Sequence, residues 1–363
     1  MSSHAASVKQ TYRFDQSFEW NYVNGPQFSG AYPSVPVTPM KSFFGLPVRS
    51  RFGVPSSILS NSRWVETYAR LGFDILTFKT VRSVARACGS APNWMFLDRN
   101  GLEDRLYAGD QTMVVGDAPA STQGATMAGS FGMPSVLPQM WEPDLERACR
   151  SIGEGQVLIG SVVGSAGPDV SDDAFVADFT DLTRRVCAAG VPIVEANLSC
   201  PNVGKAEGQL YLDIERSRTI ARAVKEASGG RPVLLKVGLM EEPERLLAFM
   251  RAVNGYADGL VLINAPSRRI VAPDGSAAFP PGRERAGVTG TAIKPIALGA
   301  GRAAQQIIER ERMALQIVGV GGLTFAGDAL EFIEAGACAA QSATGAMFNP
   351  MLAIEVKAAT PAV

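Results

Sequence analysis

The sequence predicts an α/β fold, a (β/α)8 TIM barrel with an N-terminal extension and an insertion after the second strand. Three observations lead to this prediction. Apolar runs of strand length alternate with helical stretches from about residue 44 onward, as they do in proteins with a parallel sheet. About eight such runs occur, and most intervening segments are long enough for a crossover helix. Unusual polar residues and glycines gather at the ends of the runs, where barrels carry their chemistry.

The predicted strands are short apolar runs, and helix-end signals support the alternation between them. Two helices, Trp64–Leu71 and Asp328–Ala335, are followed by Gly72 and Gly336, the residue type that commonly ends a helix. A doubly wound open sheet is the competing α/β architecture. The predicted strands are Phe52–Ser56, Asp74–Lys79, Val157–Val162, Ile193–Asn197, Val233–Lys236, Gly259–Asn264, Leu315–Gly319 and Ala339–Ala343.

Two segments lie outside the alternation. Residues 1–42 are rich in aromatic residues, Pro, Ser and Asn without helical or strand periodicity, so we expect an N-terminal extension that packs on a neighbour or a surface. Residues 43–363 then form the barrel domain. Between Val81 and Met140 the alternation is interrupted, which predicts an inserted loop region over one mouth of the barrel.

Composition excludes several classes of protein. With 46% hydrophobic and 19% charged residues, the chain can bury a large core and is globular rather than disordered. The net charge is −1 and no block of Lys and Arg stands out, which argues against nucleic acid or an anionic membrane as a partner. No secretory signal and no apolar run of membrane-spanning length is found.

The cysteines and the histidine restrict the possible chemistry. Five cysteines are scattered without a CxxC pair, so neither a disulfide framework nor a metal site is expected. This distribution fits a reducing compartment, and we expect a cytoplasmic protein. The only histidine, His4, lies in a Ser/Ala-rich start. A histidine base, a His-containing triad and a His-ligated metal are therefore not expected.

Polar residues close several predicted strands in turn. Lys79, Lys236 and Asn264 each end an apolar run. A lysine at the end of a buried strand is costly unless it meets an anion, although a lysine can also extend to solvent. Asn197 ends the fourth strand and Cys200 follows it. That stretch also fits a strand end with ordinary capping residues and an inert buried cysteine.

Glycine-rich segments follow the last two strands. Gly319–Gly322 and Ser342–Gly345 are small-residue strand ends, which let backbone N–H groups approach a phosphate. A third glycine-rich turn is expected at Gly287–Thr291. Glycine also marks plain turns, but two such ends at successive strands favour a phosphate site.

The segment Glu195–Asn202, with the sequence Glu-Ala-Asn-Leu-Ser-Cys-Pro-Asn, resembles the catalytic-loop signature of the dihydroorotate dehydrogenase family. Other matching segments recur in the family's order, and together they cover the chain from about Phe44 to the C-terminus, apart from residues 84–127. These segments are Phe52–Ser56, Lys79–Thr80, Ser130–Ser135, Lys236, Ile263–Asn264, Gly287–Pro295 and Val318–Gly322.

The resemblance implies an FMN-dependent dehydrogenase that acts on a CH–CH bond of a dihydropyrimidine-like cyclic amide or acid. It implies Cys200 as the catalytic base, as in the family's soluble class, and Lys236 as a second catalytic residue near the flavin's N1 and O2 edge. The residues implied to hold FMN are Ser56, Lys79, Thr80, Asn197, Lys236, Ile263, Gly290, Gly321, Gly322, Ala343 and Thr344. Those implied to contact substrate are Lys79, Phe131, Gly132, Met133, Asn197, Asn202 and Asn264.

Two positions depart from the family's pattern. Gly129 stands where cysteine-class relatives commonly carry an Asn that bonds the pyrimidine, and Ala265 stands where relatives carry Ser or Thr. An unpaired polar substrate edge costs about 1–3 kcal/mol per group. We therefore expect a substrate other than dihydroorotate itself, either with fewer polar ring groups or larger and filling the space at Gly129. A bridging water can also replace a lost side chain.

Two alternatives from other classes stay open at this point. One is a non-redox phosphate-binding barrel enzyme, although its usual acidic base at a strand end is not evident. The other is a flavin-binding relative without turnover, serving as a structural or partner subunit. The resemblance implies a homodimer, and it leaves fumarate, NAD through a partner subunit, or oxygen as the electron acceptor.

Overall fold

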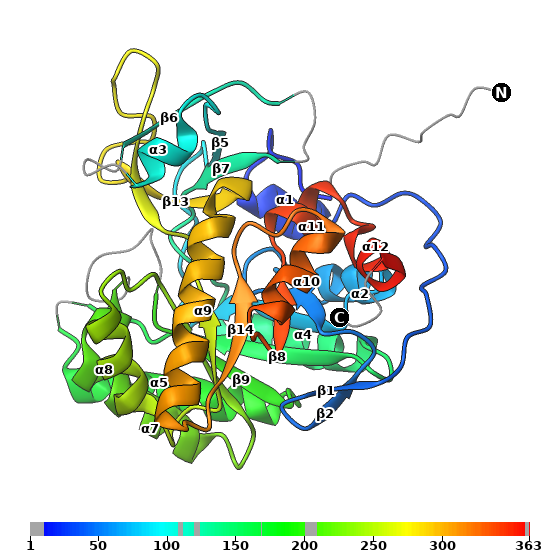
Figure 1. Ribbon diagram of the computed structural model, residues 1–363, viewed down its shortest axis with the longest axis vertical. Helices are drawn as coiled ribbons and strands as arrows, with labels where there is room; N and C mark the ends of the chain where they lie inside the picture. The colour runs from blue at the N-terminus through cyan, green and yellow to red at the C-terminus, as the bar shows by residue number, and fades with distance from the viewer. Residues whose placement is uncertain (1–10, 108–111, 120–123, 168, 200–208, 360–362) are drawn as a thin grey trace.

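The computed structural model describes residues 11–107, 112–119, 124–167, 169–199, 209–359 and 363. Within these residues, eight parallel strands close into a barrel in which each strand pairs with the next one along the chain (Figure 1). This closure confirms the predicted TIM barrel and excludes the open sheet. The strands are β3 (Phe52–Val54), β4 (Ile75–Val81), β8 (Val157–Val162), β9 (Ile193–Asn197), β10 (Val233–Val237), β11 (Gly259–Leu262), β14 (Gln316–Val320) and β15 (Ala339–Gln341).

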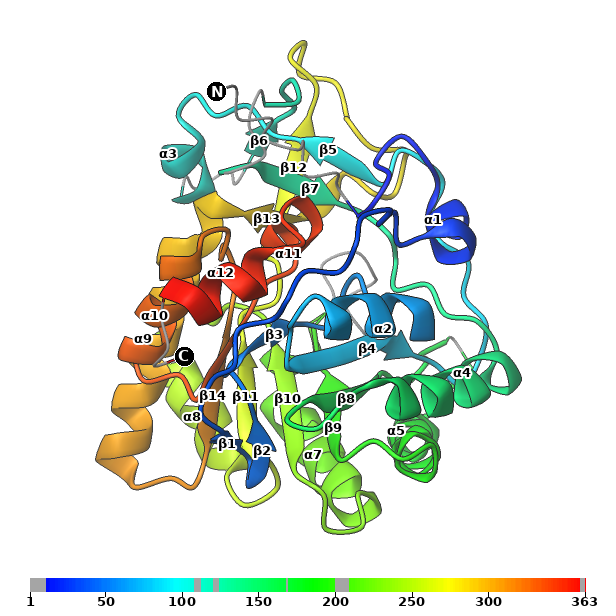
Figure 2. The same ribbon diagram turned by 90° about the vertical axis from the view of Figure 1, so that its right-hand side faces the viewer.

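Helices surround the barrel and supply the crossovers between its strands (Figure 2). Gly72 and Gly336 follow the helices α2 and α10 with φ of +90° and +99°, which confirms both glycine stops because glycine adopts this region without a steric penalty. No helix of the described residues is both long and apolar enough to span a bilayer. The helices are α2 (Ser62–Arg70), α4 (Pro138–Ser151), α5 (Asp172–Ala188), α7 (Ile214–Ala227), α8 (Pro243–Val253), α9 (Lys294–Glu311), α10 (Ala326–Glu334), α11 (Thr344–Phe348) and α12 (Leu352–Ala359).

The barrel interior changes from apolar to polar along the strands. On β9, Ile193 packs in an apolar layer with residues such as Leu234 and Val318, and Phe43 packs there from the hairpin β1 (Lys41–Phe43) and β2 (Leu46–Val48). Because side chains alternate along a strand, Glu195 and Asn197 share the inward face of β9 and lie nearer its carboxyl end. Both are buried. The apolar layer therefore supports a polar layer above it.

The segment after β4 forms more structure than the sequence indicates. We expected an inserted loop region between Val81 and Met140, and its place in the chain is confirmed. It contains strands, however, which join two later strands in a five-stranded sheet of order β5-β7-β13-β12-β6. The strands are β5 (Trp94–Phe96), β6 (Thr112–Val114), β7 (Thr126–Gly129), β12 (Ser267–Val271) and β13 (Arg285–Gly290), and the segment also carries α3 (Leu102–Tyr107). Figure 2 shows this sheet beyond the end of the barrel.

The prediction of a glycine-rich turn at Gly287–Thr291 is wrong in its position. Residues up to Gly290 belong to β13, and a 3₁₀ turn, η2 (Thr291–Ile293), follows. Gly290 has φ of +96°, and a Cβ atom there would lie 2.0 Å from the Ala125 carbonyl oxygen. Glycine at this position therefore permits β13 to approach the backbone of Ala125 closely. The turn itself begins at Thr291, after the strand has ended.

The N-terminal segment contains a helix that its composition does not predict. Residues Phe18–Asn24 form α1, and the Ser17 hydroxyl accepts a hydrogen bond from the Trp20 N–H at its start. Upstream, the Thr11 hydroxyl lies 2.7 Å from the Tyr68 hydroxyl of α2. The described part of the extension thus packs on its own barrel. We keep the division into residues 1–42 and 43–363 as a proposal.

A buried ion pair fixes the C-terminal helix at the amino end of β4. Lys357 Nζ of α12 lies 2.7 Å from Asp74 Oδ2, and both side chains are 1% exposed. The Ser50 hydroxyl donates to the same oxygen. Burial raises the pKa of Asp74, and the attraction of Lys357 opposes that shift.

Replacing Lys357 with methionine should destabilise the fold by about 3–5 kcal/mol, because the Asp74 carboxylate loses its buried cation. Removing the cation raises the pKa of Asp74 further above its unfolded value. The destabilisation should therefore grow as pH rises from about 4 and shrink in acid. Urea unfolding across pH measures it. Arg251→Met, which removes an exposed ion pair with Glu311, is the control and should have a much smaller effect.

Candidate active site

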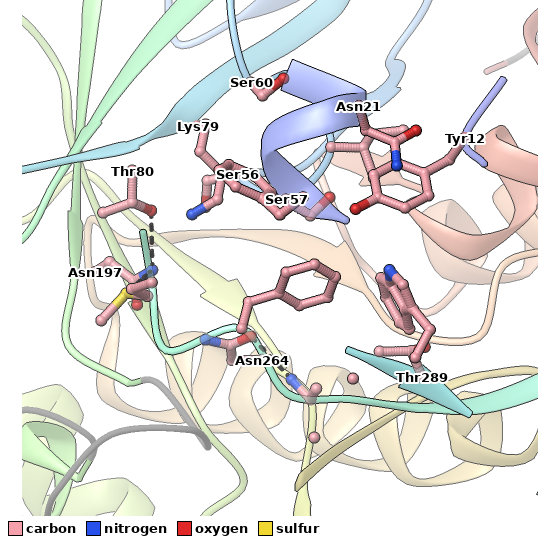
Figure 3. Close-up of a pocket in the computed structure, with 18 of the residues that line it drawn as sticks. Tyr12, Asn21, Ser56, Ser57, Ser60, Lys79, Thr80, Asn197, Asn264 and Thr289 are labelled. Atoms are coloured by element: carbon pink, nitrogen blue, oxygen red, sulfur yellow. Dashed lines mark hydrogen bonds between the residues drawn. The ribbon is translucent and has the colours of Figure 1, made fainter. Parts of the chain in front are cut away.

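A pocket lies at the carboxyl ends of the barrel strands, and its walls differ in chemistry (Figure 3). Polar side chains from the strand ends form one side. Aromatic residues from the N-terminal segment and from the segment after β4 form the other. The polar lining residues at the strand ends include Ser56, Lys79, Thr80, Asn197 and Asn264, and the aromatic lining residues are Tyr12, Phe18, Tyr22, Trp94 and Phe131.

The strand-end residues singled out in the sequence are brought together here. Lys79 and Thr80 lie near the end of β4, Asn197 is the last residue of β9, and Lys236 is the fourth residue of β10. Lys236 and Asn197 are only 4% and 3% exposed. Asn264 follows β11 and shares the pocket lining with Lys79 and Asn197. Lys236 is not a lining residue itself, but it donates a hydrogen bond to the lining residue Ser56. The roles of all these residues stay predictions.

One arm of a hydrogen-bond network begins at Lys236. Its Nζ donates to the Ser56 hydroxyl at 3.1 Å. The Ser56 hydroxyl donates in turn to Glu195 Oε1 at 2.6 Å. Glu195 lies on β9 and is completely buried. A lysine and a glutamate that are both buried are thus connected through one serine.

A second arm begins at Asn197 and reaches the same carboxylate. Asn197 Nδ2 donates to Thr80 Oγ1 at 3.1 Å. Thr80 Oγ1 lies 3.0 Å from Ser161 Oγ, and Ser161 donates to Glu195 Oε1 at 2.7 Å. Our sequence interpretation gave Glu195 no role. An acidic residue in the middle of an apolar strand is the signal that marks it.

The loop after β7 forms the wall expected to contact substrate. Phe131 and Met133 line the pocket, and Met133 Sδ accepts a hydrogen bond from Asn197 Nδ2 at 3.7 Å. Gly132 and Met133 have φ of +79° and +51°, a region that glycine favours and other residues seldom adopt. The loop therefore turns sharply beside Asn197.

Cys200 and Asn202 lie outside the described residues. The described chain reaches Ser199, whose carbonyl oxygen accepts a hydrogen bond from the Asn264 side chain. The backbone N–H of Ser199 donates to Asn197 Oδ1 at 3.2 Å. Two pocket residues therefore hold the residue that directly precedes Cys200.

Gly129 does not leave a vacancy in the pocket wall. It pairs with Trp94 in the antiparallel register of β5 and β7. A Cβ atom on Gly129 would lie 2.8 Å from Cζ3 of the Trp94 ring. The space that we expected a larger substrate to fill is therefore occupied by Trp94. The sequence offers no signal for this contact, because Trp94 lies 35 positions away in a strand that was not predicted.

The aromatic wall owes most to the N-terminal segment. Tyr12 is 5% exposed, and its ring lies 6.4 Å from that of Trp94 in an edge-on arrangement. Burial raises the pKa of the Tyr12 phenol, so the hydroxyl stays protonated at neutral pH. Figure 3 shows this hydroxyl directed toward the pocket. The N-terminal aromatic residues of this wall were not recognised from the sequence, because only tertiary packing brings that segment here.

Small residues end β14 and β15 side by side. The two strands pair in parallel with Val320 beside Gln341, so Gly321–Gly322 and Ala343–Thr344 emerge next to one another. Gly321 and Gly322 have φ of +128° and +79°. A Cβ atom on Gly322 would lie 2.5 Å from the backbone nitrogen of Lys294. Glycine at position 322 therefore permits the close approach of the Lys294 backbone.

Comparisons with known proteins show which family this chain resembles. Residues 148–359 match the family model described as dihydroorotate dehydrogenase. The chain is 33% identical over 361 residues to a protein of Dictyostelium discoideum named dihydroorotate dehydrogenase, with 96% of each chain covered.

Two bacterial relatives match a shorter part. One from Oceanobacillus iheyensis, named dihydroorotate dehydrogenase B (NAD(+)), catalytic subunit, is 30% identical over 54% of this chain and 60% of its own. One from Pediococcus pentosaceus, named putative dihydroorotate dehydrogenase A (fumarate), is 33% identical over 53% of this chain and 59% of its own. The chain belongs to the dihydroorotate dehydrogenase family.

Proposed function

We propose that the chain is an FMN-dependent dehydrogenase that acts on the CH–CH bond of a dihydropyrimidine-like cyclic amide or acid of the dihydroorotate type. One observation carries the proposal most: polar residues at the ends of β3, β4, β9 and β11 line one pocket, in a chain of this family. The metabolic role that follows is in pyrimidine metabolism. Neither the non-redox alternative nor the non-catalytic one is favoured by any feature of the site.

The residues around the pocket fit FMN. Lys236, Asn197 and Thr80 offer an ammonium, an amide and a hydroxyl to a ring with several acceptors. Gly321 and Gly322, with Ala343 and Thr344, would offer backbone N–H groups to a phosphate. Ser56, Lys79, Ile263 and Gly290 complete the proposed set. Bound FMN would supply a hydride acceptor at its N5 atom.

Cys200 is the proposed base. Dehydrogenation removes a proton from the carbon next to the one that loses hydride, so a base is needed on the face of the substrate away from the flavin. A thiol with the ordinary pKa near 8.5 is only about 3% thiolate at neutral pH. A neighbouring lysine raises that fraction because it stabilises the negative charge. Asn197 and Asn264 both form hydrogen bonds with Ser199, the residue that precedes Cys200 in the sequence.

The substrate site is proposed to favour a carboxylate and to offer few partners to the ring. Lys79 would pair with the carboxylate, beside the Phe131–Met133 backbone. Asn197, Asn202 and Asn264 would hold amide groups in plane. With Trp94 packed over Gly129, and with Ala265 lacking a hydroxyl, we infer a substrate with fewer polar ring groups rather than a larger one.

We also propose candidates for the electron acceptor and for the oligomeric state. The names of relatives mention fumarate for one and NAD(+) for another, and oxygen is a third candidate. We infer a cytoplasmic homodimer from the resemblance to the soluble class of the family. Steady-state assays with each acceptor, and light scattering, test these inferences.

The proposal is tested first by purification of the protein. We expect a yellow protein that releases FMN on denaturation. A colourless protein that binds no FMN on reconstitution would instead support a non-redox phosphate-binding enzyme. Anaerobic mixing with a panel of dihydropyrimidine acids should then bleach the flavin. A yellow protein that no panel member reduces would support a flavin-binding relative without turnover.

A further inference from the structure

Glu195 is an acidic side chain placed where a charge is expensive. It is completely buried, and its Oε2 atom has no hydrogen-bond partner. A buried carboxylate persists only where partners offset the loss of water. Here both partners, Ser56 and Ser161, donate to the other oxygen, Oε1. Both hydrogen bonds to the carboxylate are therefore accepted by the same oxygen atom.

The proton count fixes the direction of every bond in the network. A hydroxyl carries one hydrogen, and Ser161 uses its own on Glu195. The contact between Thr80 and Ser161 must then be donated by Thr80, which itself accepts from Asn197 Nδ2. Ser56 likewise donates to Glu195 and accepts from Lys236. The two arms thus run from Lys236 and from Asn197 toward the carboxylate.

We propose that Glu195 is a positioning residue whose carboxylate orients the Lys236 ammonium and the Asn197 amide toward the flavin and offsets the charge of Lys236. This inference deepens the proposed function and rests on it. Without an acceptor at Glu195, the Ser56 hydroxyl could turn its hydrogen toward the position of Lys236. The Ser56 hydrogen would then face the Lys236 ammonium, in place of the oxygen lone pair that accepts its hydrogen bond.

Another buried polar pair in the barrel serves as a comparison. Gln341 Nε2 of β15 donates to Thr77 Oγ1 of β4 at 3.1 Å, and both residues are almost completely buried. Neither residue is a member of the two arms that run from Lys236 and from Asn197 to Glu195. If Glu195 contributed only to stability, its substitution and a substitution in this pair should have the same effect on FMN. If Glu195 positions Lys236 and Asn197, only its substitution should change FMN affinity and potential.

The test is the midpoint potential of bound FMN in Glu195→Gln, measured with its affinity for oxidised FMN. Glutamine keeps the size and an acceptor oxygen but removes the negative charge. We expect the potential to rise, because the charge of Lys236 is then less offset and favours the reduced flavin. A tenfold gain in relative affinity for reduced FMN corresponds to about 30 mV for two electrons. A shift of at least this size is expected.

Two further variants keep the proposal testable if Glu195→Gln folds poorly. Ser161→Ala removes one donor to Glu195 and should weaken binding of oxidised FMN about threefold to tenfold, as expected for one hydrogen bond. Thr77→Val removes a buried hydroxyl outside the network and should change neither affinity nor potential. Thermal unfolding of all three apoproteins reports the purely structural cost.

The outcomes separate this inference from the proposed function. An unchanged or lowered potential in Glu195→Gln, or equal effects of Ser161→Ala and Thr77→Val on FMN affinity, would overturn the positioning role while leaving a flavoenzyme. A wild-type protein that binds no FMN would remove the proposed function instead. A raised potential in Glu195→Gln, with Thr77→Val unchanged, supports the positioning role.

Discussion

Cys200→Ala should keep FMN bound and slow its reduction by substrate by about 10²- to 10⁴-fold, the usual contribution of a positioned base. The expectation rests on the family's catalytic-loop motif and on the way that Asn264 and Asn197 hold Ser199 beside the pocket. Anaerobic stopped-flow measurement of the flavin absorbance gives the rate. Reduction of the wild type should accelerate as pH rises toward the thiol pKa, since the thiolate is the base.

Cys88→Ala is the matched control for this variant. Cys88 is a partly buried cysteine, and burial, the largest cause, raises the pKa of its thiol to about 12. It is therefore neutral at working pH and should be dispensable. Cys200→Ser should retain a small part of the rate. Wild-type reduction by Cys200→Ala would remove this residue from the mechanism, and loss of FMN from it would make its role structural.

Lys236→Met should weaken FMN retention, lower the midpoint potential and slow flavin reduction by about 10²-fold. Methionine keeps most of the volume and deletes the ammonium. At 4% exposure the charge is shielded little by water, so its loss removes a large part of the stabilisation of developing negative charge. Spectroelectrochemical titration gives the potential, and ultrafiltration gives the FMN affinity.

Lys225→Met on α7 is the control for a lost lysine. Its ammonium pairs with Asp258 at the edge of the barrel, away from the pocket lining, and its loss should leave the potential unchanged. A Lys236→Met variant with the wild-type potential would show that this lysine does not act on the flavin. It would also leave the Ser56 hydrogen bond without a role in redox tuning.

The barrel was predictable because buried parallel strands are written in the sequence as continuous apolar runs, such as Val157–Val162 and Gly259–Leu262. The second sheet was not, because β5 and β6 contain three residues each. Such strands are too short to show a period, and β6 and β7 pair with strands more than 150 positions away. Helix α1 was missed for a similar reason, since seven residues give little periodicity.

The site divides in the same way. Lys79, Asn197, Lys236 and Asn264 were predictable because strand order alone carries them to one end of the barrel. The roles of Trp94 and of the N-terminal aromatic residues were not, since they depend on which distant segments pack over the strand ends. The sequence shows that Gly129 replaces the Asn of relatives, but it does not show that the Trp94 ring lies where that side chain would be.

The most direct test of the account is anaerobic reduction of the purified holoenzyme by dihydroorotate and by a related cyclic amide acid with fewer polar ring groups. We predict that both bleach the flavin, and that dihydroorotate turns over with a kcat/KM below about 10⁴ M⁻¹s⁻¹, the lower end of the usual enzyme range. A higher value would identify dihydroorotate as a good substrate and remove the inference drawn from Gly129 and Ala265. A flavin that neither compound reduces would contradict the proposed dehydrogenase itself.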